Sequence, residues 1–532
     1  MSSLAGTATL IRLNLRLDRF RLPAWVLTFG VLTYLTGVAF EELYPTVGSR
    51  RELGTTLVNN PALVAMVGPA FDLSSIGGLV AWRLGGVASV LTGLFAVFTV
   101  TRHTRAEEEA QRLELVMAGV VGRIAPLAAA LMVSFAGSLT IGGAVAAALV
   151  ALGQPAAGAM ALGLGIACVG LTFAGVSAVT AQLTTNARTS SALAGTTLAA
   201  AYLIRAVGDS ASSGRMELLS FASPVGWAQQ VRPFAGERWW IFAMFATLLF
   251  ICAGTAYVLI TGRDLGAGVF EPRRGPARGG ALTLGPFGLA WRLHQGSIAA
   301  WTVGFAITGA VFGSLAEGIG DLLDDTPQLR EIFDSMGGGG LLEDVFFSSV
   351  LGLLAVVASA FAVQATLRLR SEETGYRAEP VLATKVGRVR WALSHMLPVT
   401  VGVLSMMAVA GASAGLVHGL RTGDAAGAAL NILSTALTQV PAVLVLAGLT
   451  LALFGVAPRL IFLAWVALTA FLLLGQLGPI LSLDQWVMNL SPFSHVPFTS
   501  DDPELLPAAL LTTTALLLTA VGLTGLRRRD IG

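Results

Sequence analysis

The residues able to do chemistry in this sequence are mainly glutamates and arginines, and they gather in one stretch that occurs twice. Residues 105–123 read RAEEEAQRLELVMAGVVGR, and residues 370–388 read RSEETGYRAEPVLATKVGR. The two copies align without a gap, so that Glu107 in the first corresponds to Glu372 in the second, 265 positions later. A polar segment repeated between apolar ones predicts a soluble partner that docks on the chain twice.

Each copy is predicted to form a helix with paired charges. Glu108 precedes Arg112 by four residues and Glu373 precedes Arg377 by four, which is the order that favours an ion pair along a helix. The simpler alternative is a solvated loop helix without a partner. Such a loop has little reason to keep the same internal order at the same place in two repeats, and the repetition therefore favours docking.

The chain lacks the residues that nucleotide or metal chemistry would need. A phosphate-binding loop of the G-x-x-x-x-G-K-[ST] type requires a lysine before Ser or Thr, whereas Lys385, the only lysine, is followed by Val386. The 5 histidines are scattered without metal-ligand spacing. Both cysteines, Cys168 and Cys252, fall in apolar runs and are expected to be buried thiols. We therefore expect no catalytic residue, no metal and no cofactor in this chain.

The elements that position the charged stretches must be membrane-spanning helices. Of the 532 residues, 55% are hydrophobic and 12% are charged, which is about half the charge of a soluble domain. Apolar runs long enough to cross a hydrocarbon core of about 30 Å recur along the chain, and in lipid such runs must be helical. The sequence predicts an all-α polytopic membrane protein. Since no carboxylate lies well inside a span, a proton-coupled transporter is disfavoured.

Twelve spans are predicted, in two sets of six. The first set lies at about 23–40, 76–101, 125–151, 157–184, 189–207 and 238–261, and the second at about 297–316, 346–367, 391–416, 425–456, 459–479 and 505–526. The chain divides accordingly into a first repeat at 1–265, a linker at 266–285 and a second repeat at 286–532. Residues 10–22 are rich in arginine and are expected to form an interfacial helix on the cytoplasmic leaflet.

The distribution of arginine orients these spans. Basic residues mark the N-terminal segment, the loop after the second span of each half, the linker and the end of the chain, as they mark cytoplasmic loops. The opposite side carries acidic residues, above all between positions 317 and 344. Both termini and both charged stretches are therefore expected in the cytoplasm.

The internal repeat extends beyond the charged stretches. Residues 263–266 (RDLG) match residues 529–532 (RDIG), so each half ends in the same motif. The Ser-Pro pair at 223–224 matches the pair at 491–492, in a semi-polar segment before the last span of each half. Two halves that begin and end on the same side are parallel repeats, related by a pseudo-two-fold axis along the membrane normal.

Two six-span halves, each with a charged Glu-Glu helix between its second and third spans, resemble the permeases of ABC-2-type (type V) exporters. The Arg-x-Glu-Glu and Arg-x-Glu motifs and the single-chain length are most similar to the fused actinobacterial type, which exports polyketide antibiotics or acts in multidrug efflux. The resemblance implies two coupling helices seated in a separate ATPase, elbow helices at 10–22 and 285–295, and re-entrant helices near 218–236 and 486–500. The residues assigned to ATPase coupling are Arg105, Glu107, Glu108, Arg112, Glu114, Arg123, Arg370, Glu372, Glu373, Arg377, Glu379 and Arg388.

The resemblance also implies that the second and fifth spans of each half line the substrate pathway. The side chains assigned to it are Arg83, Phe95, Phe98, Tyr202, Phe347, Phe361, Trp465, Phe471 and Gln476. Aromatic residues at helical spacing equally fit packing or contact with lipid. Arg83 and Arg205 have no charged counterpart in the second half. They predict either an off-centre site for an amphipathic anion or side chains that reach the outer interface.

The predicted function is the membrane subunit of an ATP-binding-cassette exporter that moves bulky lipophilic compounds, such as polyketide antibiotics or drugs, out of the cell. ATP and Mg²⁺ would bind a homodimeric ATPase partner. The other expected partners are membrane lipid and a lipophilic small molecule, with no nucleic acid. A stand-alone secondary multidrug transporter and an exporter of lipid or cell-envelope precursors are the alternatives. The implied location is the plasma membrane of a high-GC actinobacterium.

Overall fold

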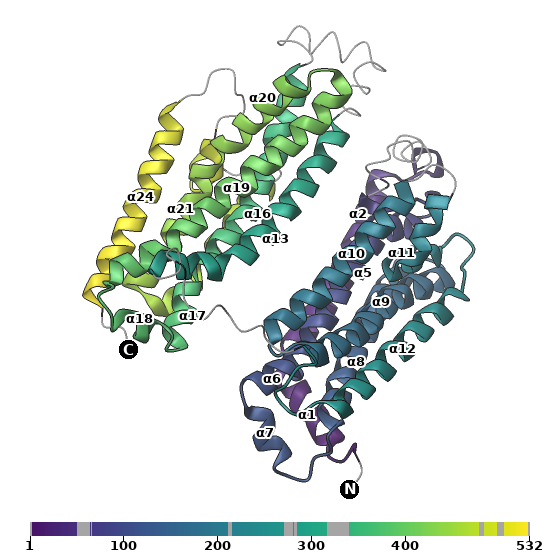
Figure 1. The fold of residues 1–532 in the computed structure, drawn as a ribbon. Coiled ribbons are helices and arrows are strands. Elements are labelled where there is room, and N and C mark those ends of the chain that lie inside the picture. The colour runs from purple at the N-terminus through teal and green to yellow at the C-terminus, as the bar shows by residue number, and fades with distance from the viewer. Residues whose placement is uncertain are drawn as a thin grey trace. The chain divides into compact units, whose positions relative to one another are not determined.

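The chain forms two helical units, Met1–Arg274 and Gly275–Gly532 (Figure 1). The computed structural model describes residues 3–50, 64, 66–210, 215–270, 280, 285–316, 340–477, 484–496 and 505–529, and no strand occurs among them. Within these residues, 11 helices are long and apolar enough to cross a membrane. The predicted all-α polytopic fold class is confirmed.

The first unit is built around one central helix. Its elements are α1 (Thr7–Leu17), α2 (Arg21–Leu43), α5 (Ile76–His103), α6 (Arg105–Glu109), α7 (Arg112–Met117), α8 (Ala125–Ala151), α9 (Ala156–Leu183), α10 (Ala187–Ser210), η1 (Arg215–Ala222), α11 (Pro224–Gln230) and α12 (Ile241–Gly262). Helix α9 packs against α5, α8 and α12. Gly142 of α8 faces Gly163 of α9 so closely that a Cβ on either would collide with the carbonyl oxygen of the other. Small residues thus let these apolar helices meet along their backbones.

The second unit has a closely packed helix pair of its own, formed by α13 and α19. Its elements are α13 (Pro286–Leu315), α16 (Gly340–Thr366), α17 (Arg368–Thr374), α18 (Ala378–Leu382), α19 (Arg388–Thr422), α20 (Ala425–Thr438), α21 (Val440–Val456), η3 (Pro458–Leu460), α22 (Leu463–Leu477), α23 (Gln485–Met488), η4 (Pro492–His495) and α24 (Leu505–Arg528). Gly309 and Gly313 of α13 lie against the backbone of Ala410 and Ala414 of α19. Two small residues four apart on each helix give the close crossing typical of membrane helices.

Three element predictions change in detail. Helix α22 has 15 residues, fewer than a span needs, so the count of twelve spans stays a prediction. The span predicted at 425–456 is divided at Gln439 into α20 and α21. The separate elbow helix predicted at 285–295 is wrong, because α13 runs unbroken from Pro286, whereas in the first unit Asp18 ends α1 before α2 begins.

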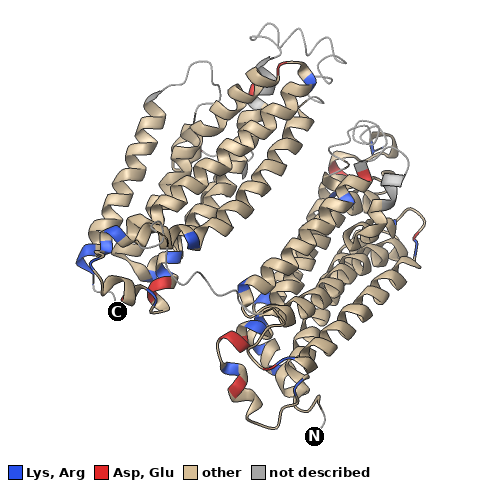
Figure 2. Cartoon of the chain, viewed as in Figure 1, with Lys and Arg blue, Asp and Glu red and all other residues tan. Residues whose placement is uncertain are grey.

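Charged residues gather at one end of each unit (Figure 2). In the first unit they surround α6 and α7, and in the second they surround α17, α18 and the end of α24. The acidic residues at 317–339 that helped to orient the spans lie outside the described residues. The cytoplasmic location of the charged ends therefore stays a prediction from the sequence.

The Ser-Pro segments form short helices capped by their serines. Ser223 accepts hydrogen bonds from the amides of Val225 and Gly226 at the start of α11, and Ser491 accepts one from the amide of Phe493 at the start of η4. Both arrangements satisfy amides that the first helical turn leaves without a partner. Each Ser-Pro pair thus starts a helical turn, while the re-entrant path through the membrane stays a prediction.

Candidate functional site

Each charged stretch is two short helices joined by a sharp turn, not the single helix expected. The turn between α6 and α7 contains Gln111 with φ 57°, and the turn between α17 and α18 contains Tyr376 with φ 55°. Residues other than glycine rarely adopt this left-handed conformation. Gln111 and Tyr376 are again 265 positions apart, so the two stretches share their backbone as well as their sequence.

The turn changes which charges pair. Arg112 lies 3.0 Å from the carboxylate of Glu107, and Arg377 lies 3.1 Å from that of Glu372. The predicted pairs with Glu108 and Glu373 are wrong, because a continuous helix was assumed across a residue that reverses the chain. Both glutamates are instead directed into their own units.

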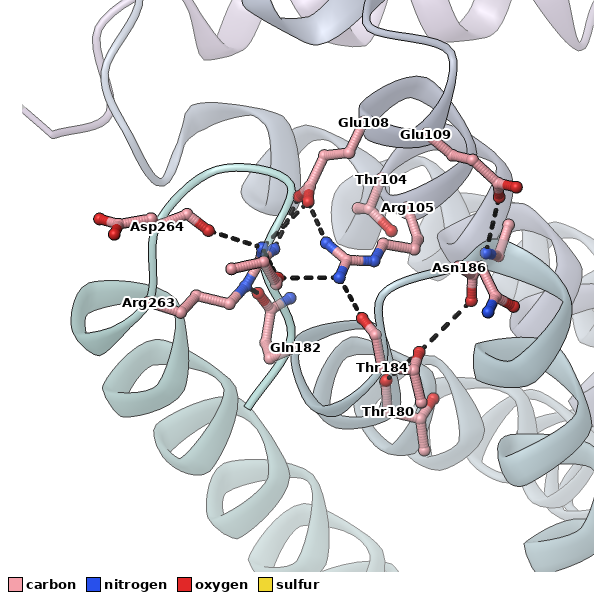
Figure 3. A network of polar contacts seen from close by, with 12 residues as sticks. Thr104, Arg105, Glu108, Glu109, Thr180, Gln182, Thr184, Asn186, Arg263 and Asp264 are labelled. Carbon is pink, nitrogen blue, oxygen red and sulfur yellow. Dashed lines mark hydrogen bonds and ion pairs between the residues drawn. The ribbon is translucent and has the colours of Figure 1, made fainter. Parts of the chain in front are cut away.

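Glu108 joins two arginines, Arg105 and Arg263, at the charged end of the first unit (Figure 3). Its carboxylate accepts hydrogen bonds from Arg263, at 2.7 Å and 3.0 Å, and from Arg105. Arg263 also donates to the side-chain oxygen of Gln182 at 2.7 Å, and Arg123 donates to the carbonyl of Arg263. We call Arg105, Glu108, Arg123 and Arg263 the first charge clamp. It binds α6 to the ends of α9 and α12, which are remote in sequence.

The second unit contains a related arrangement, the second charge clamp, formed by Arg370, Glu373, Arg388 and Arg529. Arg529, just after α24, forms an ion pair with Glu373. Arg388 donates to the carbonyl of Arg529 at 2.5 Å, as Arg123 does to that of Arg263. Arg370 donates to the carbonyl of Pro458, whereas Arg105 donates to that of Thr184. In both units the clamp fixes the charged helix to the last span.

The first unit has a further tie that the second cannot form in the same way. The carboxylate of Glu109 accepts a hydrogen bond of 2.9 Å from the amide of Ala187, the first residue of α10. A negative charge at a helix N-terminus is favourable. The corresponding residue in the second copy is Thr374, which carries no charge. Helix α6 is therefore fixed to α10, the fifth span of its unit, by a charged contact that Thr374 cannot form in the second unit.

Helix α1 is joined to the same end of the unit. Asp18 forms an ion pair with Arg102 at 2.6 Å, and its other carboxylate oxygen lies 2.5 Å from Nε2 of His103, at the end of α5. Burial alone would raise the pKa of Asp18, but the hydrogen bond and charge of His103, with the charges of Arg102 and Arg21, hold it below its ordinary value. Asp18 is thus ionised at neutral pH and connects α1 to the segment that precedes α6.

The residues left exposed around the clamps form the outward surface of each charged stretch. Arg112 and Arg377 have 65% and 61% of their side chains exposed, and Glu114 and Glu379 are exposed beside them. Leu115 is also exposed, with Pro380 at the corresponding position in the other copy. The two surfaces have matching charges but different apolar neighbours.

The aromatic residues assigned to the substrate pathway divide into buried and exposed sets. Phe95, Phe347 and Phe361 are buried, against Trp25, His418 and Trp301 respectively. They pack inside their own units and do not face open space. The exposed or half-buried residues are Phe98, Trp465 and Phe471. The side chain of Gln476 lies outside the described residues.

The two arginines of the first unit differ in environment. Arg83 is exposed. Arg205 is fully buried, forms an ion pair of 3.3 Å with Asp209 and lies over the ring of Tyr202. The hydroxyl of Tyr202 donates to the carbonyl of Met66 at 2.6 Å. The expectation that Arg205 reaches the outer interface is wrong, because a buried carboxylate and an aromatic face satisfy its charge inside the unit.

Sequence reasoning missed several residues of this site. Arg263 and Arg529 were noted as part of a repeated terminal motif but were not assigned to the site, and Gln182 and Glu109 were not assigned either. One signal could have identified the two arginines. The charged stretch carries glutamates, the terminal motif begins with an arginine, and both are predicted at the same end of each half. Complementary charge makes a contact between the two duplicated motifs favourable, but it does not specify which residues meet.

The chain is similar to known proteins along its whole length. The family model described as "Multidrug efflux system permease Rv1217c, C-terminal domain" matches residues 284–527. The chain is 40% identical over 534 aligned positions to the multidrug efflux system permease protein Rv1217c of Mycobacterium tuberculosis, covering 100% of this chain and 96% of that protein.

Proposed function

The chain belongs to the family of actinobacterial ABC-2-type multidrug efflux permeases, and from this premise we propose that it is the membrane subunit of an ATP-driven drug exporter. A separate homodimeric ATPase would bind ATP and Mg²⁺ and dock one subunit on each charged stretch. The observation that carries this proposal is the pair of charge clamps, which share in both units a pair between a glutamate and the arginine after the last span, and the same backbone turn.

The clamps give a route for movement from an ATPase to the spans. Glu108 and Glu373 are held by the arginines that follow the last span of each unit. A docked subunit that moves α6 or α17 would therefore also move the end of α12 or α24. In the first unit, Glu109 adds a direct connection to α10. Charge-assisted hydrogen bonds are about twice as strong as neutral ones, which favours movement of the joined helices together.

The exposed arginines are the best positions for testing ATPase docking. We expect the wild-type chain to co-purify with a cognate ATPase, with two ATPase subunits for each permease. Arg112→Glu combined with Arg377→Glu would place like charges beside Glu107 and Glu372 and would lower ATPase recovery at least tenfold. Because both side chains are mostly exposed, folding should be unaffected.

Arg421→Glu is the matched control, because Arg421 is an exposed residue at the other end of α19. It should leave ATPase recovery unchanged. Unaltered co-purification of the double variant would contradict docking on the charged stretches. Drug export by the purified chain in vesicles without any ATPase would contradict the proposal as a whole and would favour a secondary transporter.

The proposed substrates are bulky lipophilic compounds, including polyketide antibiotics. The apolar composition of the spans supports lipophilic compounds, and the similarity to a multidrug efflux permease supports drugs as a class. Arg83 would favour acidic members, because an exposed arginine near a span end can attract a carboxylate. Arg83→Ala should lower export of an acidic polyketide several-fold and leave a neutral drug unchanged, as measured by uptake into inverted vesicles. Equal export of both compounds by the variant would remove the anion site from the proposal.

A further inference from the structure

The second unit contains a lateral groove that plays no part in the charge clamps. It has a volume of about 430 Å³ and lies among α13, α19, α21 and α24, within the size range of small-molecule sites. Its walls are apolar, with Leu393 and Leu397 of α19 on one side and Leu516 of α24 on the other. All three leucines are exposed on the surface of the unit. The residues of α19 that line the groove extend over about two helical turns.

Basic residues lie on two of the groove's helices, beyond its lining residues. Arg390 is exposed one helical turn before Leu393, and Arg527 and Arg528 are exposed at the end of α24. The start of α19 and the end of α24 meet there, since Arg388 donates to the carbonyl of Arg527 at 3.4 Å. Three exposed arginines therefore lie beyond the lining residues of the groove, toward this end of α19 and α24.

The corresponding region of the first unit is built differently. Phe135 stands at the position that corresponds to Thr400 in the groove, and it packs with Leu127, Ala178 and Ala256 in a hydrophobic cluster among α8, α9 and α12. The position that corresponds to Arg390 is Ala125, which is buried. Both the apolar space and its nearest arginine thus distinguish the second unit from the first.

We propose that this groove is a binding site for one anionic phospholipid, with an acyl chain along Leu393 and Leu397 and the phosphate beside Arg390, Arg527 and Arg528. An aliphatic groove with a cationic end matches the two parts of such a lipid. Basic pockets between spans on the cytoplasmic side are known to select anionic head groups. The inference rests on the membrane location of the chain and is independent of the proposed ATPase and of the transported drug.

Native mass spectrometry of the full chain in detergent tests the site. The purified protein is titrated with phosphatidylglycerol or with phosphatidylcholine of the same acyl chains. We expect the wild type to bind one phosphatidylglycerol at least fivefold more tightly than phosphatidylcholine. Arg390→Ala should remove this preference. Thr400→Phe combined with Thr512→Phe, which fills the groove from two of its lining positions, should remove the tight adduct.

Val258→Phe is the control for added aromatic volume, because Val258 is 65% exposed on α12 of the first unit. It should bind lipid as the wild type does. Equal affinity for both lipids in the wild type would overturn head-group selection by the arginines. A tight adduct that survives in the Thr400→Phe/Thr512→Phe variant, with unchanged thermal unfolding, would overturn the groove as the site, as would the absence of any tight adduct in the wild type.

Discussion

Glu108 and Glu373 occupy equivalent positions, but their carboxylates differ in burial and in the number of arginines that meet them. Glu108 has 7% of its side chain exposed and contacts Arg105 and Arg263. Glu373 has 16% exposed and, among the described residues, pairs with Arg529. The removal of one partner from a buried ion pair costs more than the removal from a half-solvated one, because the remaining charge has less access to water.

We therefore expect the two carboxylates to differ in their effect on unfolding. Glu108→Gln should lower the free energy of unfolding by about 3 kcal/mol, and Glu373→Gln by about 1.5 kcal/mol. Thermal unfolding of the purified variants in one detergent measures both. Arg263→Gln added to Glu108→Gln should cost less than the sum of the single changes, since the two residues interact. Additive costs, or a larger cost at Glu373, would contradict the described burial.

The ion pairs of Asp18 predict a particular pH dependence. The pKa of Asp18 in the folded chain lies below the ordinary value of 3.8. A carboxyl of this kind stabilises the fold at any pH above the unfolded value and loses that contribution as the pH falls through the folded pKa. We expect Asp18→Asn to unfold at a lower temperature than the wild type at pH 7, and the difference to close only below pH 3.8. A difference that has already closed at a pH well above 3.8 would show that Asp18 is not held ionised by these partners.

At the scale of the elements, the glycine contacts between spans can be tested by neighbouring substitutions. A Cβ at Gly142 would collide with the backbone of Gly163, whereas a Cβ at Gly143 would meet open space. Gly142→Ala should destabilise the first unit by about 1–3 kcal/mol through overpacking. Gly143→Ala should be neutral or stabilising by up to about 1 kcal/mol, because alanine favours a helix. Equal unfolding temperatures for the two variants would contradict the close packing of α8 on α9.

The elements were predictable where one physical signal dominates. Hydrophobic length placed α8 at the expected residues, 125–151, and charge placed both stretches between the second and third spans. The turn at Gln111 was not predictable, because glutamine carries no signal for a left-handed backbone. The continuous helix α13 was also missed, since the polar residues at its start read equally well as a separate interfacial helix.

The site was predictable in its parts but not in its connections. The duplicated order of Arg105 and Glu108 was visible in the sequence, and so was the duplicated Arg263. Nothing local to either motif states that the two meet, because the contact depends on how α9 and α12 end beside α6. Likewise, Arg205 could be recognised as costly in a span, but its partner Asp209 lay just beyond the predicted boundary.

At the scale of the whole molecule, each unit has its own helices, core and charge clamp. We expect residues 1–274 and residues 275–532, expressed as separate chains in one cell, to reach the membrane and to restore drug export together. Export of a fluorescent drug from whole cells, compared with the intact chain, measures this. The matched control is a pair divided after Gly142, inside α8, which should accumulate poorly. If the pair divided after residue 274 exports no more drug than the control pair, the units depend on their covalent connection.

The two charge clamps are encoded at different places in one gene. A mutation can therefore change Glu109, or the residues around it, without any change at Thr374. In an assembly of two identical chains, every inherited change would appear on both sides at once. A fused chain removes that constraint, so one side can keep an ancestral contact while natural selection modifies the other.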